Sequence, residues 1–127
     1  MINQVDTNSN SQYFYDLTLV NKMCRGKQEL VLKLMKVFIL QVSKSIEELT
    51  LASQEGNIEK IRNELHKVKP MLAYYGTRGI EKELLIFENM VLDHFSTEEI
   101  ETRLKLLNKI THQTVANMKT DFGISNN

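Results

Sequence analysis

A long apolar repeat in the first half of the chain restricts the possible folds more than any other feature. Between residues 27 and 54, large apolar side chains recur at alternating intervals of three and four residues, the spacing of one face of an α-helix. The repeat consists of Leu32, Met35, Ile39, Val42, Ile46 and Leu49, with Leu34 and Phe38 beside it. At 1.5 Å per residue such a helix is a rod of roughly 40 Å, long enough to set the length of the whole fold.

Two further periodic segments follow, bounded by residues that begin and end helices. Gly56 is expected to end the long helix, Asn57 to cap the next one, and Gly76 to end that helix in turn. Residues 77–79 are predicted to form a short turn into a fourth helix. The side chains expected to face inward are Ile58, Ile61, Leu65, Val68 and Leu72 in the first of these helices, and Ile80, Leu84, Phe87 and Val91 in the second.

The last helix has its own start signal. Ser96, followed three residues later by Glu99, is the sequence of a capping box. The helix that it opens carries an inward set of Ile100, Leu104, Leu107, Thr111, Val115 and Met118. No stretch shows the alternation of period two that marks a strand, so an all-α fold is predicted.

A short helix near the amino terminus completes the predicted architecture. Residues 17–24 can form this helix with Thr18 or Asp16 as its cap, and it would close one end of the domain. We predict an up-and-down antiparallel four-helix bundle with this short extra N-terminal helix. The bundle should occupy residues 13–120. The polar stretch 1–12 is expected to be a disordered tail, and 121–127 a polar tail.

Composition limits the class of protein and its partners. The 127 residues suffice for one domain with a modest core. Because 16 basic residues balance 16 acidic ones, we expect no nucleic acid and no membrane as partner. A monomer is also expected. Cys24 is the single cysteine, residues 1–12 lack the apolar core of a signal peptide, and the apolar stretch 30–42 is too short and too charged to span a bilayer. A cytoplasmic location is therefore expected.

One histidine on the helix predicted after Asn57 is the main candidate for chemistry. At 100° per residue, His66 points about 120° away from the centre of the apolar stripe and should look outward. Arg62, Lys69 and Ala73 share its flank at helical spacing. An exposed imidazole with two cations and a small residue beside it suits contact with a large, negatively charged group.

The spacing of His66, Lys69 and Gly76 resembles the histidine-containing phosphotransfer (HPt) domain family. That family carries a His-x-x-Lys-Gly run followed six residues later by a second glycine. Upstream, residues 16–19 look like the family's opening helix, Phe38 stands where its second helix keeps an aromatic, and residues 56–58 resemble the turn before the histidine helix. The resemblance covers most of the chain.

The chain departs from the family pattern at Pro70, which replaces the glycine after Lys69. A proline inside a helix has no amide hydrogen for the carbonyl four residues back, and that carbonyl belongs to His66. We therefore expect the helix to bend or open here, and docking of a partner to be altered.

The resemblance implies a phosphocarrier in a two-component multistep phosphorelay. His66 would accept a phosphoryl group from the aspartate of one receiver domain and pass it to another. Lys69 would stabilise the phosphate, with Arg62 as a further candidate. The expected partners are a response regulator receiver domain and a hybrid sensor kinase. The receiver supplies magnesium, so the chain needs no cofactor or metal of its own and is a transfer intermediate without turnover. By analogy, partner docking is expected near Val31, Leu34 and Met35.

Other functions remain open on the residues alone. The same fold could serve as a non-catalytic adaptor that docks on a receiver or kinase without accepting phosphate, or as a purely structural helical subunit. Lys67, His94 and His112 are better explained as surface or helix-end residues. A two-metal site with Glu-x-x-His ligands is not supported, because the residues three before the histidines are Asn63, Val91 and Lys109.

Overall fold

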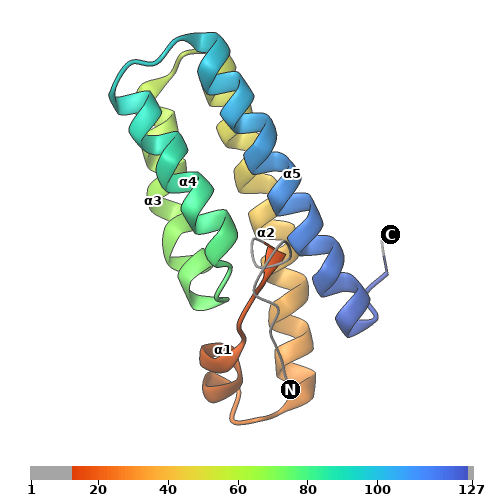
Figure 1. Ribbon diagram of the computed structural model, residues 1–127. Coiled ribbons are helices and arrows are strands. Elements are labelled where there is room, and N and C mark those ends of the chain that lie inside the picture. Colours follow the sequence, from red (N-terminus) through yellow and green to blue (C-terminus); the bar gives the residue numbers. More distant parts are fainter. Residues whose placement is uncertain (1–12, 126–127) are drawn as a thin grey trace.

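The computed structural model describes residues 13–125, and this part of the chain is all-α, without strands (Figure 1). The helices are α1 (Thr18–Met23), α2 (Gln28–Gln54), α3 (Ile58–Tyr74), α4 (Arg78–Leu92) and α5 (Thr97–Phe122). Of the helices within residues 13–125, none combines the length and the apolar character needed to cross a bilayer. The tail expected at residues 1–12 lies outside the described part.

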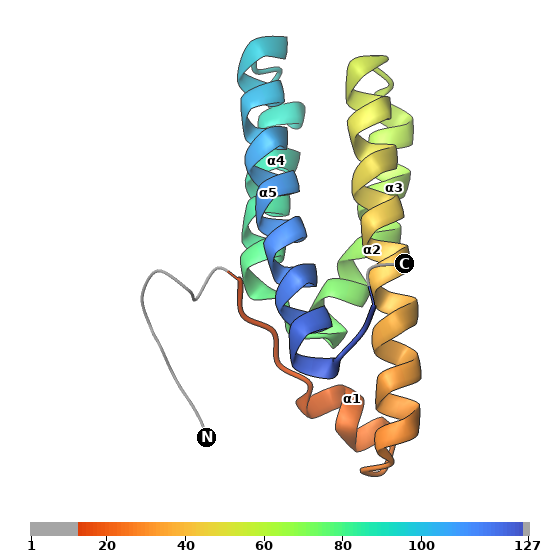
Figure 2. The ribbon, with the colours of Figure 1, turned by 90° about the vertical axis from the view of Figure 1, so that its right-hand side faces the viewer.

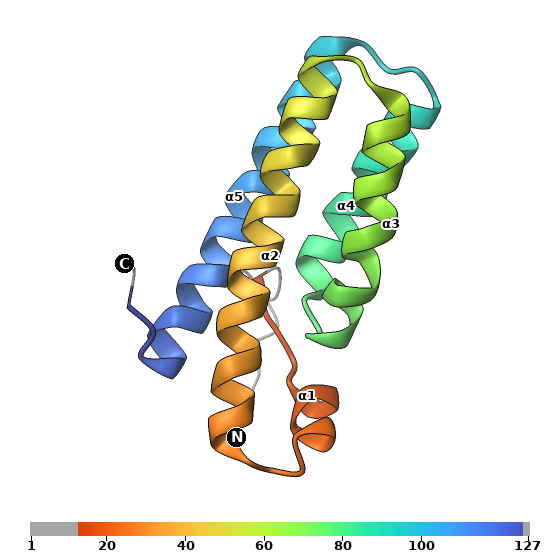
Figure 3. The same cartoon turned by 180° about the vertical axis from the view of Figure 1, so that it is seen from behind.

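The four long helices surround one core. α2 contacts α3 and α5, and α4 contacts the same two helices, so each long helix packs mainly against two other long helices. Seen from the side, α4 lies with α5 and α2 lies with α3, and α1 is at one end beside α2 (Figure 2). The α2–α3 and α4–α5 connections lie at the end far from α1, whereas the α3–α4 connection lies near α1 (Figure 3).

Most of the predicted inward residues are buried, and the exceptions have local reasons. Phe38 is fully buried and stacks on Tyr75, with 4.2 Å between ring centroids. Val31 is buried and Leu32 only half-buried, because the core face of α2 is rotated from the predicted stripe near its start. Ile58 is exposed, since it is the first residue of α3, at the end of the helix. Ile100 is half-buried near the start of α5.

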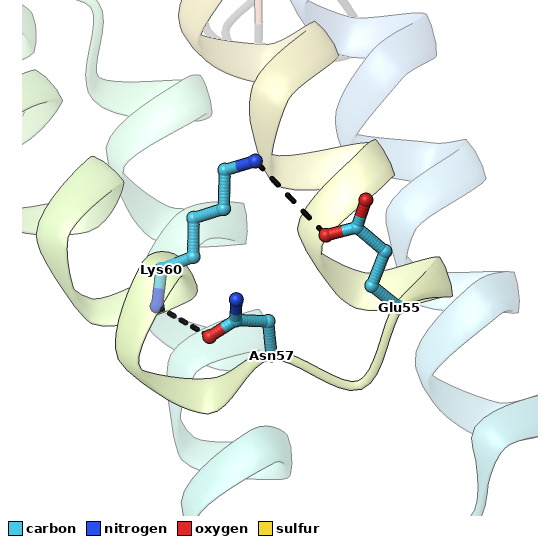
Figure 4. A network of polar contacts seen from close by, with 3 residues as sticks. All are labelled: Glu55, Asn57 and Lys60. Atoms are coloured by element: carbon cyan, nitrogen blue, oxygen red, sulfur yellow. Dashed lines mark hydrogen bonds and ion pairs between the residues drawn. The ribbon is translucent and has the colours of Figure 1, made fainter.

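The junction between α2 and α3 is built as predicted. Gly56 has a positive φ of 67°, and the side chain of Asn57 caps α3 by accepting a hydrogen bond from the Lys60 amide at 3.1 Å. The Lys60 ammonium lies 4.0 Å from Glu55 across the same turn (Figure 4). The capping box at the start of α5 is also confirmed, with the Glu99 amide donating to Ser96 Oγ at 3.2 Å.

The predicted turn at residues 77–79 is wrong by two residues. α4 begins at Arg78, so Gly79 lies inside the helix and is buried. The turn is made by residues 75–77 instead. The Thr77 hydroxyl donates to the Leu72 carbonyl oxygen at 3.0 Å and so stays with the end of α3. Glycine was therefore an unreliable marker of the loop here, because Gly79 is a buried residue in the first turn of α4.

The segment before α1 connects two elements at the α1 end of the fold, the α3–α4 turn and the end of α5. The Tyr15 hydroxyl donates to the Asp121 carboxylate on α5, and burial together with this bond raises the pKa of Tyr15. The Asp16 amide donates to the Tyr75 carbonyl oxygen at 3.2 Å. Because α5 continues to Phe122, the predicted polar tail at 121–127 begins inside a helix. Residues 13–16 thus link the α3–α4 turn with the end of α5.

Asp16 makes the stability of α1 sensitive to acid. Its carboxylate accepts from the Thr18 hydroxyl at 2.6 Å and the Thr18 amide at 3.0 Å, and these bonds hold its pKa below the ordinary 3.8. A lowered pKa contributes stability that is present above pH 3.8 and is lost as pH falls through the folded-state value. Asp16→Asn should therefore flatten the fall in melting temperature between pH 5 and pH 2.5. An equally steep acid limb in the variant would contradict this account.

Candidate functional site

The candidate site lies on the outward side of α3. Leu65 and Val68 on this helix are buried, whereas His66 between them is exposed, as the helical geometry predicts. His66 stands near the middle of the helix, about two turns from either end. Its imidazole is therefore held on a regular element and can be reached from solvent.

Lys69, the predicted phosphate-binding lysine, is engaged across the α3–α4 seam. Its ammonium lies 2.6 Å from Glu88 Oε1 on α4. The Glu88 side chain is 22% exposed and the Lys69 side chain 47% exposed, so the pair is only partly open to water. This ion pair orients the Lys69 side chain towards α4.

The other two cations near His66 differ in their surroundings. Arg62 is exposed, and its side chain has no hydrogen bond or ion pair with any residue in the described range 13–125. Lys67 lies 3.5 Å from Glu64 on the side of α3 that faces α2. Of the two cations that helical spacing predicts beside His66, Lys69 is in an ion pair with Glu88, whereas Arg62 is in no ion pair within residues 13–125.

Pro70 does not interrupt α3. The helix runs through it to Tyr74, so the opening expected at this residue is not observed. The proline ring is exposed and cannot donate to the His66 carbonyl oxygen. Packing of Val68 and Leu72 against the core holds the backbone in helical form on both sides of Pro70.

The apolar residues suggested for partner docking on α2 are largely unsuitable. Val31 and Met35 are 1% and 0% exposed, which corrects the expectation that they lie on an open face. Leu34 is half-buried, and its carbonyl oxygen accepts from the Tyr75 hydroxyl at 3.1 Å. The repeat on α2 is so continuous that spacing alone could not separate core from surface. The large apolar side chains that are exposed on the helices beside α3 are Leu30, Val37, Leu40 and Leu51 on α2, and Leu85 and Leu92 on α4.

The remaining histidines lie elsewhere. His94 follows the end of α4 with a positive φ of 59°, and His112 is exposed on α5 beside a groove of about 680 Å³ between α2 and α5. Across residues 13–125, no cluster of three or more His, Cys, Asp or Glu side chains is placed to hold a metal ion. Neither histidine is therefore part of the α3 site.

Glu88 is the one residue at this site that the sequence analysis missed. A signal existed, because Glu88 is one residue beyond the buried Phe87 and so lies at the edge of the apolar stripe on α4. Its pairing with Lys69 depends on how far α4 is shifted along α3, which periodicity does not determine. Chemically, the site offers a nucleophilic nitrogen with cations nearby.

Comparisons with protein-family models, with curated proteins and with solved structures find no match to this chain.

Proposed function

We propose that the protein is a phosphocarrier of a two-component phosphorelay, with His66 as the phosphoacceptor. The observation that supports this most is an exposed imidazole in the middle of a regular helix with Arg62 and Lys69 on its flank. The four-helix bundle arrangement of HPt domains is part of the same proposal, supported by the ring of contacts among α2, α3, α4 and α5.

The proposed chemistry requires from this chain only a nucleophilic nitrogen and a neighbouring cation. An unprotonated nitrogen of His66 attacks the phosphorus of a receiver's aspartyl phosphate. The bond between phosphorus and the aspartate oxygen breaks, and the carboxylate leaves. Charge spreads over the three equatorial oxygens of the transferring group, so a neighbouring cation stabilises the transition state and the product alike. The receiver contributes its acidic pocket and magnesium, and this chain contributes half of the active site.

The charge distribution supports an acidic partner. The chain is neutral overall, yet between residues 17 and 46 it carries six cations and one carboxylate, Glu29. The cations are Lys22, Arg25, Lys27, Lys33, Lys36 and Lys44. Two exposed apolar side chains of α1, Leu19 and Met23, lie in the same region. A stretch of chain that combines positive charge with exposed apolar side chains favours association with an acidic protein and makes association salt-dependent.

A transfer assay tests the proposal. The protein is incubated with magnesium and a panel of receiver domains phosphorylated by radiolabelled acetyl phosphate. Acid-labile, alkali-stable label should then appear on this chain, as expected for phosphohistidine. No label from any receiver, with binding still detected, would instead support the adaptor function.

The adaptor alternative has two observations in its favour. Pro70 places a ring one helical turn from His66, and Glu88 already occupies Lys69. Both features would weaken acceptance of phosphate without preventing a partner from binding. The adaptor therefore predicts receiver binding that is unchanged when His66 is replaced and label that never exceeds background.

Pro70 provides a separate test of how the partner approaches. If its ring obstructs access to His66, Pro70→Gly should raise the transfer rate about threefold, equivalent to roughly 0.7 kcal/mol in the barrier. Pro70→Ala also removes the ring and restores the amide hydrogen but keeps Cβ, so it should raise the rate as well, and its difference from Pro70→Gly reports the effect of Cβ. Equal rates in all three proteins would show that Pro70 is no obstacle.

A further inference from the structure

The pair between Lys69 and Glu88 limits what Lys69 can offer to a phosphoryl group. The two charged atoms are 2.6 Å apart, and the carboxylate is the less exposed partner. The Glu88 carboxylate is partly shielded from water, which strengthens this charge-assisted hydrogen bond relative to a fully exposed ion pair. Within residues 13–125, Lys69 is the sole ion-pair and hydrogen-bond partner of Glu88. A phosphoryl oxygen on His66 would therefore have to compete with Glu88 for the ammonium.

Arg62 faces no such competition. It lies four residues before His66 on the same helix, and side chains at this spacing are neighbours on the helix surface. Its guanidinium is exposed and has no partner among the described residues. A guanidinium also matches the geometry of phosphate oxygens, because it can donate two parallel hydrogen bonds.

We infer that Glu88 restrains Lys69, so that Arg62 is the cation first available to a phosphoryl group on His66. This inference rests on the proposed function and assigns its regulation. Glu88 is a positioning residue, because it acts on the phosphoryl group only through Lys69. Lys69 stabilises the phosphoryl group only to the extent that its ammonium is released from Glu88.

The test uses phosphoramidate, which phosphorylates imidazoles directly and needs no receiver. A ring nitrogen attacks the phosphorus, the phosphorus–nitrogen bond of the reagent breaks, and ammonia leaves. The rate at His66 is the total rate minus that of His66→Gln, which removes any contribution from His94 and His112. The phosphorus-31 chemical shift of the phosphohistidine reports the cations that contact it, and a merely structural role would not change it.

A set of substitutions separates the contributions of the two cations. Arg62→Gln should slow phosphorylation about tenfold and move the phosphorus signal, and Arg62→Lys should restore much of the rate. Lys69→Gln should slow it less than about threefold when Glu88 is present. In the Glu88→Gln background, Lys69→Gln should cost about tenfold, since the ammonium is then released. Lys67→Gln, on the other side of α3, is the matched control and should change neither rate nor signal.

Two outcomes would overturn the inference. One is a larger loss in Lys69→Gln than in Arg62→Gln, and the other is an effect of Lys69→Gln that is the same with and without Glu88. Neither outcome contradicts the proposed function. That function fails instead if phosphorylated receivers leave no label on the wild-type protein. The two failures are distinguishable because phosphoramidate bypasses the receiver.

Discussion

Replacement of His66 with glutamine is expected to leave no acid-labile label on the protein after incubation with phosphorylated receivers. Glutamine keeps the size and polarity of the side chain but has no nucleophilic nitrogen. In other mechanisms the loss of a covalent nucleophile costs roughly 10⁴–10⁶ in rate, so the label should fall to background. Because His66 is exposed, the free energy of unfolding should change by less than about 0.5 kcal/mol.

His112→Gln is the matched control for this experiment. His112 is also exposed on a long helix, but it lies on α5 beside the groove facing α2. Its replacement should leave the label unchanged. If His66→Gln keeps its label and His112→Gln loses it, the phosphoacceptor has been assigned to the wrong helix. Urea denaturation of both variants shows whether any loss of label comes from unfolding.

The sequence sufficed for the all-α fold because its helix signals are local. The apolar repeat of α2 lies within a single helix, and the Asn57 cap and the Ser96 capping box each depend on residues within one turn. The caps satisfy free backbone amides within their own helix, and the apolar spacing shows which face will be buried before the partner helices are known. Such features could be predicted without knowing how the helices pack.

Features that depend on packing were harder to predict. The burial of Gly79 depends on where α4 meets its neighbours, and the pair of Lys69 with Glu88 depends on the register of α3 against α4. The exposure of Ile58 reflects its place at the end of α3. The exposure of His66 was predicted correctly because it follows from the geometry of α3 alone. The ion pair of Lys69 could not be predicted in this way, because it depends on how α3 and α4 pack together.

The close approach of Asp16 to Gly76 is a further packing feature, and it carries the largest expected effect on stability. Gly76 has a positive φ of 63°, and a Cβ built there would lie 2.6 Å from Asp16 Cβ and 2.6 Å from the Asp16 carbonyl oxygen. The left-handed conformation costs a non-glycine residue roughly 1–2 kcal/mol. The backbone of Asp16 would also have to move, which breaks its hydrogen bond to Tyr75, worth about 1 kcal/mol.

Gly76→Ala should therefore lower the free energy of unfolding by about 3 kcal/mol. Gly56→Ala is a matched control, because Gly56 has a similar φ of 67° but no atom within 4 Å of the built Cβ. It should cost only about 1–2 kcal/mol, the backbone contribution alone. The difference between the two variants in urea denaturation measures the contact with Asp16. Equal losses would mean that residues 13–16 adapt freely, and that the link from the α3–α4 turn to α5 adds little to stability.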